Sequence, residues 1–275
     1  MYVLSIVGPS DSGKTTLLER LAEHLAEQGR VGTVKHIDCT PDIETDGKDT
    51  DRHRQAGAAT TYGIGETEWF ATGETLDLET ALERLGQRCE YALVEGFTDA
   101  TLPTVALGGR DVERGTVIAR PETVEEAAVD EIVSALHETE PYETLSSLVA
   151  KVKRSPDEDK SGAIATFTGR VRAKEHPDDE PTECLEFEKY DGVAEQKMAA
   201  IREELEARDG VYEVLLYHKT GVVDAGEDIV FVVVLAGHRT EAFRTVEDGI
   251  NRLKEEVPLF KKEVTVGEEF WAHER

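Results

Sequence analysis

The most constraining feature of the sequence is the octapeptide Gly8–Thr15, which reads GPSDSGKT. It follows Tyr2–Val7, an apolar run short enough to be a buried strand, and it precedes a segment in which leucines recur at helical spacing. Gly8 and Gly13 permit a tight turn in which backbone N–H groups and the helix N-terminus face an anion. The octapeptide therefore predicts a phosphate-binding loop between a strand and a helix.

The side chains of this phosphate loop extend the prediction to a nucleotide. Lys14 can reach the β- and γ-phosphate oxygens, and the Thr15 hydroxyl can ligate Mg²⁺. Glu95 ends an apolar strand beside the loop, where its carboxylate can hold Mg²⁺ through water. The motif suits ATP or GTP, and hydrolysis needs groups beyond it. The predicted nucleotide-binding residues are Gly8, Ser10, Asp11, Ser12, Gly13, Lys14, Thr15 and Thr16.

Apolar segments continue to alternate with helical patterns through the first half of the chain. Further strands are predicted at 31–37, 91–94 and 117–119, and a helix led by Pro121 runs to about His137. This alternation indicates an α/β domain of the P-loop NTPase type with a mainly parallel sheet. The polar segment Thr40–Arg54 reads as a loop over the ligand edge of that sheet.

A proline in the charged stretch HETEPY marks the predicted domain boundary, which gives domains of residues 1–138 and 139–275. In the second domain strands and helices do not alternate strictly, which indicates an α+β fold. Predicted strands occupy 163–171, 184–190, 211–218 and 228–236, and predicted helices occupy 145–152, 193–208 and 240–255.

The chain is strongly acidic, with a formal net charge of -27 distributed over both halves. Such a charge argues against binding to nucleic acid or to an anionic membrane, and it is typical of a surface that stays hydrated at high salt. Cys39, Cys89 and Cys184 lie far apart and form no CxxC pair, so neither a disulfide framework nor a Cys-rich zinc site is expected. With no apolar run of about 18 residues, we expect a soluble protein of the cytoplasm.

The first half of the chain resembles a known protein family. The segments GPSDSGKTTLLERL, VKH, DGKDTDRHRQAGA and LVEGF are similar to those of the molybdopterin-guanine dinucleotide biosynthesis adaptor family, MobB, over roughly residues 1–120. The resemblance implies a dimeric, GTP-binding protein that assists the molybdenum cofactor guanylyltransferase. It also implies a nucleotide- or pterin-handling role for Lys35, His36, Asp46, Asp49 and Arg52, although Ile37-Asp38-Cys39 departs from the second His that the family often carries.

Clusters of cations stand out in the second half because the chain is otherwise so acidic. They occur at Arg170 and Arg172, at His238-Arg239, and at Lys254, Lys261 and Lys262 around Pro258. Clustered cations suit anionic ligands, and a lysine near other cations loses proton affinity and can act as an acid, base or nucleophile. The alternative to a functional role is that each lysine, taken alone, is an ordinary surface side chain exposed to solvent.

The order of motifs in this half resembles the catalytic large subunit of molybdopterin synthase, MoaE. The segments GAIATFTGRVR, LEFEKYDGVAEQKM, HKTGVVDAGEDIVFVVVLAGHRTEAF and LKEEVPLFKKE follow in the family's order over residues 162–275. The resemblance implies an α/β hammerhead fold and a homodimer. It implies a reaction in which sulfur from the thiocarboxylated C-terminus of a small ubiquitin-like subunit enters cyclic pyranopterin monophosphate, forming the dithiolene of molybdopterin.

Carried over position by position, the resemblance assigns roles to seven residues. Lys254 and Lys261 match the family's active-site lysines and are the expected catalytic residues. At the start of its domain the family usually has an extra strand before the first helix. In this chain that strand is either absent or replaced by residues 139–144. The residues expected to bind substrate are Phe167, Arg172, His238, Arg239 and Arg275.

Together these observations predict a fusion of two activities of molybdenum cofactor biosynthesis. The first domain would bind GTP and Mg²⁺, and the second would be a sulfurtransferase. Two alternatives remain open. The first domain could be a P-loop kinase or GTPase with its own substrate, and the second could be a scaffold that binds the ubiquitin-like protein without turnover.

Overall fold

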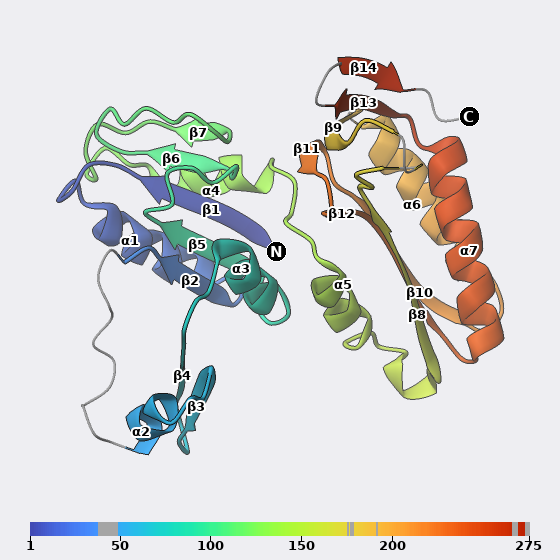
Figure 1. Cartoon of the computed structure of the whole chain (residues 1–275), viewed down its shortest axis with the longest axis horizontal. Helices are drawn as coiled ribbons and strands as arrows, with labels where there is room; N and C mark the ends of the chain where they lie inside the picture. The colour runs from blue at the N-terminus through green and yellow to red at the C-terminus, as the bar shows by residue number, and fades with distance from the viewer. Residues whose placement is uncertain (38–48, 175, 177–178, 191, 266–268, 273–275) are drawn as a thin grey trace. The chain divides into compact units, whose positions relative to one another are not determined.

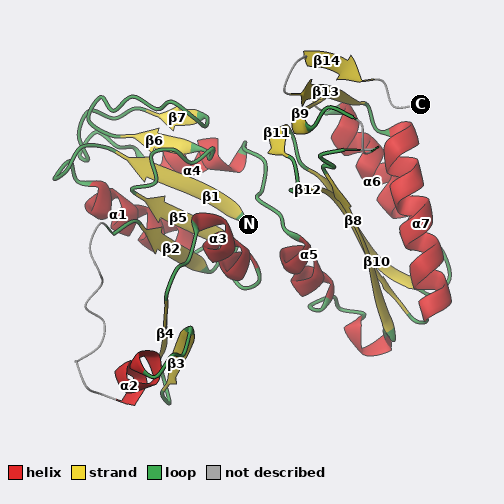
Figure 2. Cartoon of the chain, viewed as in Figure 1, coloured by secondary structure: helices red, strands yellow, loops and turns green. Residues whose placement is uncertain are grey.

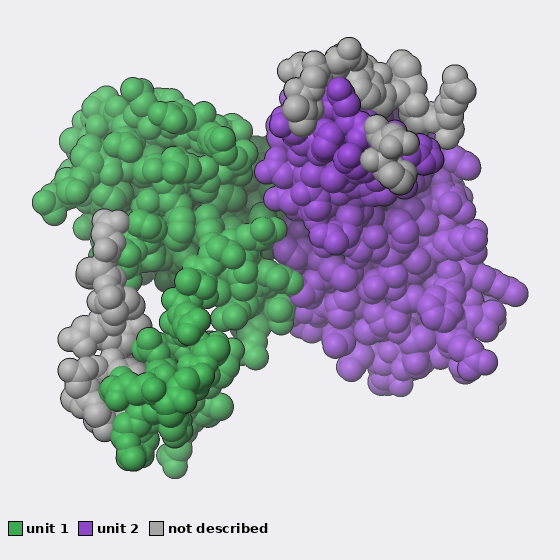
Figure 3. Space-filling view, in the orientation of Figure 1, with its two compact units in different colours: residues 1–142 green, residues 143–275 purple. Residues whose placement is uncertain are grey.

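The chain divides into two units, Met1–Tyr142 and Glu143–Arg275 (Figure 3). The computed structural model describes all residues except 38–48, 175, 177–178, 191, 266–268 and 273–275. The sequence placed the division between residues 138 and 139. Each unit has its own buried core, and each is described separately below.

Five parallel strands form the centre of the first unit (Figure 1). Their order is β2-β5-β1-β6-β7, so chain order reverses at β1, and ligands of open α/β sheets bind beside such a reversal. This all-parallel sheet confirms the predicted α/β class. The strands are β1 (Tyr2–Val7), β2 (Val31–Lys35), β5 (Tyr91–Glu95), β6 (Thr104–Ala106) and β7 (Val117–Ala119).

Helices cover both faces of this sheet, which explains why its central strands are apolar throughout. Leu4 and Ile6 of β1 pack with the leucines of α1 (Lys14–Ala26) and with α4 (Val129–His137). Val3, on the opposite face, packs with Leu82 of α3 (Leu78–Gly86). Burying one such Leu or Ile side chain contributes roughly 1.5–3 kcal/mol. Strands β1 and β5 pair directly and are packed on both faces by these two cores. Their carboxyl ends therefore lie side by side.

A separate two-stranded sheet lies outside this core. It consists of β3 (Thr60–Ile64) and β4 (Trp69–Gly73), which pair antiparallel, and α2 (Asp49–Gln55) packs against β3. The sequence analysis did not predict these strands, nor α3 and β6. The loop prediction for Thr40–Arg54 is wrong from Asp49 onward, because acidic residues at the start and basic residues at the end of 49–55 favour a helix.

The helix predicted from Pro121 is also shorter than expected. It begins at Val129, because residues 121–128 form turns that run beside the phosphate loop. The guanidinium of Arg20 on α1 holds this segment by donating to the carbonyl oxygens of Val124 (2.6 Å) and Ala127 (3.0 Å). The tertiary contact therefore overrides the helical pattern.

The second unit combines two antiparallel sheets with helices (Figure 2). In the three-stranded sheet the order is β10-β12-β8, with β8 (Ala163–Arg170), β10 (Val211–His218) and β12 (Asp228–Ala236). Side chains of β12 alternate between two cores. Val230, Val232 and Val234 face α6 (Val193–Glu206) and α7 (Arg239–Glu256), whereas Phe231, Val233 and Leu235 face α5 (Leu145–Val152).

The second sheet has the order β11-β9-β13-β14. Its strands are β9 (Thr182–Lys189), β11 (Gly221–Asp224), β13 (Leu259–Thr265) and β14 (Glu269–Ala272), and a 3-10 turn, η1 (Glu158–Lys160), precedes β8. These antiparallel sheets and their helices confirm the predicted α+β class. All seven elements predicted between residues 145 and 255 are present within a few residues, but β11, β13 and β14 were not predicted.

Three further features bear on the sequence predictions. Residues 139–144 form no strand, so nothing there replaces the strand with which the resembled family usually opens. Cys89 and Cys184 are both half-buried and are not joined to each other by a disulfide, and Cys39 lies outside the described residues. Within the part of the chain that the structure describes, no helix combines the length and the apolar composition needed to cross a membrane.

Candidate nucleotide site and cationic cavity

The phosphate loop lies at the carboxyl end of β1, between that strand and α1 (Figure 1). Gly13 caps α1 with a φ of 90°, a left-handed conformation that L side chains rarely adopt. A Cβ at Gly13 would lie 3.0 Å from Cβ of Val124, and a Cβ at Gly8 would lie 2.8 Å from Oγ of Ser12. Both glycines are therefore needed for the backbone to form this concave turn.

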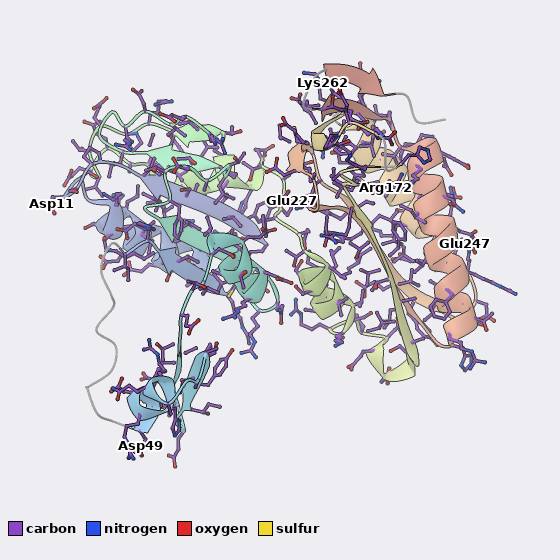
Figure 4. All side chains as sticks on the ribbon, viewed as in Figure 1. Asp11, Asp49, Arg172, Glu227, Glu247 and Lys262 are labelled. Atoms are coloured by element: carbon purple, nitrogen blue, oxygen red, sulfur yellow. The ribbon has the colours of Figure 1, made fainter. Side chains whose placement is uncertain are left out.

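Polar groups of the loop gather inside the turn. The Lys14 ammonium donates to the carbonyl oxygen of Gly8 at 3.0 Å and to that of Pro9. The Ser12 hydroxyl is buried and has no hydrogen-bond partner among the described residues. A buried hydroxyl without a partner is costly, so an unpaired donor beside an ammonium fits a site for an anionic group. Asp11, labelled in Figure 4, lies on this loop with a φ of 58°.

The residues predicted to hold Mg²⁺ are brought together by strand register. Glu95 lies opposite Ile6 in the parallel pair of β5 and β1, which places its carboxylate beside the start of α1. Its two oxygens lie 3.1 and 3.2 Å from Oγ1 of Thr15, and the Lys35 ammonium lies 3.0 Å from Oε1. Glu95 is only 6% exposed. A hydroxyl and a carboxylate are oxygen ligands of the kind that Mg²⁺ binds, so these residues fit the ion.

The other residues implied for nucleotide or pterin handling lie in two places. Lys35 belongs to the Glu95 cluster, and the His36 ring packs edge-on against Phe97 at 5.3 Å between centroids. Asp49 and Arg52 form an exposed ion pair of 3.6 Å on α2. Asp46 lies outside the described residues. Within the described residues, no group of three or more His, Cys, Asp or Glu side chains could hold a metal.

The second unit contains a cavity of about 670 Å³ between its two sheets and the C-terminal end of α7. We call it the cationic cavity, because its described lining holds four cations, Arg170, Arg172, Lys254 and Lys261, and one carboxylate, that of Glu263. Four of the seven residues assigned to substrate or catalysis in this half line it. They are Phe167, Arg172, Lys254 and Lys261.

Each of these side chains reaches the cavity from a different position in the fold. Phe167 lies within β8, and Arg172 follows the end of that strand (Figure 4). Lys254 occupies the last turn of α7. Lys261 lies on β13, directly opposite Phe187 of β9. Opposed residues of an antiparallel pair share one face, so Lys261 and Phe187 belong to the same wall.

His238 and Arg239 are not brought to this cavity within one chain. His238 is the N-cap of α7 and Arg239 is its first residue, whereas Lys254 lies near the other end of the same helix. At 1.5 Å per residue, Arg239 and Lys254 are roughly 22 Å apart along the helix axis. Neither His238 nor Arg239 is among the residues that line the cavity. Arg275 lies outside the described residues.

The structure also adds lining residues that sequence reasoning missed: Thr182, His218 and Glu263. The Thr182 hydroxyl donates to the Glu263 carboxylate across β9 and β13. Glu263 went unnoticed because β13 was not predicted. The signal was present in the segment LFKKEVT, where Leu259, Lys261 and Glu263 recur with the period of two that places them on one face of a strand.

Two family models match the chain. The model of MobB, molybdopterin guanine dinucleotide synthesis protein B, matches residues 3–130, and the model of the MoaE protein matches residues 137–256. A probable molybdopterin synthase of Haloferax volcanii is 54% identical over 276 residues, covering 100% of both chains. The molybdopterin synthase catalytic subunit of Cereibacter sphaeroides is 40% identical over 111 residues, which is 40% of this chain and 73% of that protein.

A solved structure of MobB from Bacillus subtilis is also similar to the chain. It is 27% identical, covers 50% of this chain and 100% of its own, and has a TM-score of 0.42. The sheets and the cavity described above define a P-loop domain and an α+β domain with a cationic cavity, joined in one chain. The chain belongs to the family of proteins that join a MobB domain to a MoaE domain. This membership assigns it to molybdenum cofactor biosynthesis.

Proposed function

We propose that the second unit is the catalytic domain of a molybdopterin synthase. It would transfer sulfur from the thiocarboxylated C-terminus of a small ubiquitin-like subunit to cyclic pyranopterin monophosphate. The observation that carries this proposal is the gathering of Arg172, Lys254 and Lys261 around one cavity. The name of the Haloferax volcanii relative supports it.

The chemistry of the cationic cavity suits these substrates. Both the cyclic phosphate and the thiocarboxylate are anions, and fixed cations stabilise negative charge more strongly in a cavity than in water. Phe167 supplies an aromatic ring against which a planar pterin can stack. Lys254 and Lys261 line the same cavity, and lysine side chains can donate a proton or serve as nucleophiles in group-transfer reactions.

His238 and Arg239 enter this proposal through a second copy of the chain. Because they lie roughly 22 Å along α7 from Lys254, one substrate cannot contact all three residues in a single chain. In the proposed homodimer the second copy would supply the His-Arg pair. Arg275 stays a prediction as a substrate-binding residue.

The test is dithiolene formation by the full-length chain in high salt, supplied with cyclic pyranopterin monophosphate and the thiocarboxylated small subunit. Lys254→Ala and Lys261→Ala should each lower the rate by about 100-fold or more, the range expected for loss of a proton-transfer group. The matched control is Lys262→Ala. Lys262 is the next residue on β13, and its ammonium lies 3.7 Å from the Glu186 carboxylate rather than lining the cavity.

Two outcomes would contradict this assignment. A folded wild-type chain that binds the small subunit but forms no dithiolene would make the second unit a scaffold. Equal losses in the Lys262→Ala, Lys254→Ala and Lys261→Ala variants would trace the effect to net charge rather than to the cavity.

For the first unit we propose binding of GTP with Mg²⁺. The support is the phosphate loop with its enclosed Ser12 hydroxyl and Lys14 ammonium, together with the contact between Thr15 and Glu95. Thr15 would ligate Mg²⁺ directly and Glu95 through water, and the ion would neutralise phosphate charge. The proposed partner is the guanylyltransferase that attaches the guanine nucleotide, and the proposed location is the cytoplasm.

Calorimetric titration with GTP and with ATP in the presence of Mg²⁺ tests this proposal. Lys14→Ala should weaken GTP binding by roughly 10- to 100-fold, the loss expected when a hydrogen bond to a charged group is removed. Arg84→Ala removes an exposed cation of α3 and should leave the affinity unchanged. Tighter binding of ATP than of GTP would contradict the assignment. Rapid turnover that depends on a separate substrate would favour the kinase alternative.

A further inference from the structure

His218 is a titratable residue of the cationic cavity to which the proposed synthase chemistry has given no role. It ends β10 and lines the cavity together with Lys254 and Lys261. The charged groups that share this lining come from β8 and the residues after it, from α7 and from β13. They are Arg170, Arg172, Lys254, Lys261 and Glu263.

Two contacts fix the His218 ring. Its Nδ1 lies 2.7 Å from the carbonyl oxygen of Lys219. A carbonyl oxygen only accepts hydrogen bonds, so Nδ1 carries the proton, and in the neutral ring Nε2 then carries the lone pair. The ring also packs edge-on against Phe187, with centroids 4.7 Å apart and an interplanar angle of 68°. His218 is therefore held as an oriented base.

Strand register places this base between the two walls of the cavity. His218 lies opposite Val230 of β12, which in turn lies opposite Gly169 of β8. Its aromatic partner Phe187 lies opposite Lys261 in the other sheet. Opposed Cβ atoms are about 4.5–5.5 Å apart, so the His218 ring and the Lys261 side chain contact or adjoin the same phenyl ring.

The proposed reaction needs such a base. When a thiocarboxylate sulfur bonds to a pterin carbon, the C–O bond of that carbon breaks and its electron pair leaves on the oxygen group. The carrier C-terminus and the pterin are then joined by a thioester. Release requires water to add to the carbonyl carbon and the C–S bond to break, with its electron pair leaving on the pterin sulfur. The products are a carboxylate, a pterin thiolate and two protons, and no atom changes its oxidation state. One proton must leave the attacking water.

The other side chains of the cavity are poorly suited to accept that proton. Lysine and arginine are ordinarily protonated at neutral pH, and a glutamate is ordinarily a much weaker base than an imidazole. Glu263 in addition already accepts a hydrogen bond from the Thr182 hydroxyl. An imidazole ordinarily changes charge between pH 6 and 7, which suits a general base at neutral pH.

We propose that His218 is the general base that removes a proton from the water that hydrolyses the carrier–pterin thioester. The assignment rests on the proposed synthase function. It adds a catalytic residue to Lys254 and Lys261, and it separates sulfur transfer from thioester hydrolysis. Cations would stabilise the oxyanion during hydrolysis, while His218 accepts the proton.

The test compares the full-length wild type with His218→Phe, which keeps an aromatic ring against Phe187. Both are given cyclic pyranopterin monophosphate and the thiocarboxylated small subunit. His218→Phe should form dithiolene about 100-fold more slowly, within the range of lost acid–base catalysis. Mass spectrometry should find the small subunit covalently joined to the pterin in this variant. The wild-type rate should rise with pH near neutrality. Added imidazole should partly restore a truncated His218→Ala variant, in which the place of the ring is left open.

The control is His24→Gln. His24 is a half-buried histidine of α1 in the first unit, and its substitution should leave the rate and pH profile unchanged. If the wild type forms no dithiolene, the synthase assignment fails and this inference fails with it. If the wild type is active, equal rates in His218→Phe overturn the inference alone. A slow His218→Phe variant without the covalent adduct, together with no imidazole rescue of His218→Ala, also overturns it, because the defect is then structural. Accumulation of the adduct in Glu263→Gln instead would assign the base to Glu263.

Discussion

At the level of single residues, neighbouring side chains of a strand point to opposite faces of the sheet, so two adjacent lysines can have different surroundings. Lys261 lines the cationic cavity, while the neighbouring Lys262 lies near Glu186 at 3.7 Å (Figure 4 labels Lys262). One lysine can therefore meet an anionic substrate while the other offsets a surface carboxylate. This difference is what makes Lys262 a matched control for Lys261.

Gly169 shows how little space the cavity wall leaves. It faces Val230 across β8 and β12, and a Cβ at this position would lie 2.4 Å from Cγ1 of Val230. Both backbones and a stiff β-branched side chain would have to shift. Gly169→Ala should therefore lower the free energy of unfolding of the second unit by about 1–3 kcal/mol, as overpacking does. Scanning calorimetry of the full chain measures this change.

The same substitution should lower the rate of dithiolene formation, because Gly169 and Val230 both line the cavity. Gly221→Ala is the control that separates backbone strain from crowding of the cavity wall. Gly221 has a φ of 77° and open space around its Cβ position, so its substitution strains the backbone without crowding the cavity. Unchanged stability in Gly169→Ala would show that the wall adjusts more readily than the distances imply.

At the scale of elements, α7 determines which cations can act together. Its 18 residues place the His238 cap and Lys254 near opposite ends. The lysine end is held in place by Arg252, whose guanidinium pairs with Glu256 at 2.6 Å and with Glu204 of α6 at 2.9 Å. The hydrogen bonds from these two carboxylates, that of Glu256 first, raise the pKa of Arg252 above its ordinary value. The end of α7 that carries Lys254 is thus tied to α6.

The hairpin of β3 and β4 carries an exposed apolar face. Tyr62 and Ile64 lie two residues apart on β3, and Trp69 lies opposite Ile64. Their exposed fractions are 55%, 83% and 61%, and the Tyr62 and Trp69 rings are 6.3 Å apart. Clustered exposed apolar residues mark interaction surfaces more often than isolated ones do. We therefore expect the proposed homodimer to cover this face.

Replacing Ile64 by Glu should weaken dimerisation. Burying one isoleucine side chain contributes roughly 1.5–3 kcal/mol, so the dissociation constant should rise roughly 10- to 100-fold, as measured by sedimentation equilibrium. Leu76→Glu is the control, because Leu76 is 57% exposed in the same unit but lies outside the hairpin. An unchanged dissociation constant in Ile64→Glu would assign dimerisation to another surface.

At the scale of the whole molecule, charge dominates. A net charge of -27 on 275 residues destabilises the folded state through self-repulsion unless counter-ions screen it. The Debye length falls from about 10 Å at 0.1 M salt to about 3 Å at 1 M. Salt should therefore stabilise this chain more than it stabilises a protein of balanced charge.

Lowering KCl from 3 M to 0.1 M should reduce the melting temperature by roughly 5–10 °C, the shift expected for a few kcal/mol in a chain of this size. Calorimetry checks the shift. NaCl at equal ionic strength should act in the same way if screening is the cause. Full stability at low salt would refute the interpretation of the acidic surface as an adaptation to high salt.

The fold could be predicted wherever a local pattern carried enough information. Strand β1 and helix α1 follow from an apolar run, a glycine turn and leucines at helical spacing, all within 26 residues. Helix α2 was missed because no apolar stripe marks it: none of its described residues is buried. Strand β13 was missed because the period of two in LFKKEVT is short and carried mainly by charged residues, and the strand is completed by pairing with the distant β9.

The sequence alone determined which chemical groups are present and which elements carry them. These include a phosphate loop at the end of a strand, lysines on either side of Pro258, and a strongly acidic surface. Only the tertiary structure decided which groups meet. It joined Thr15 to Glu95, brought His218 and Glu263 to the lysines, and kept His238 at the far end of α7. Periodicity and propensity act over a few residues, whereas these contacts depend on strand register and helix packing between distant segments.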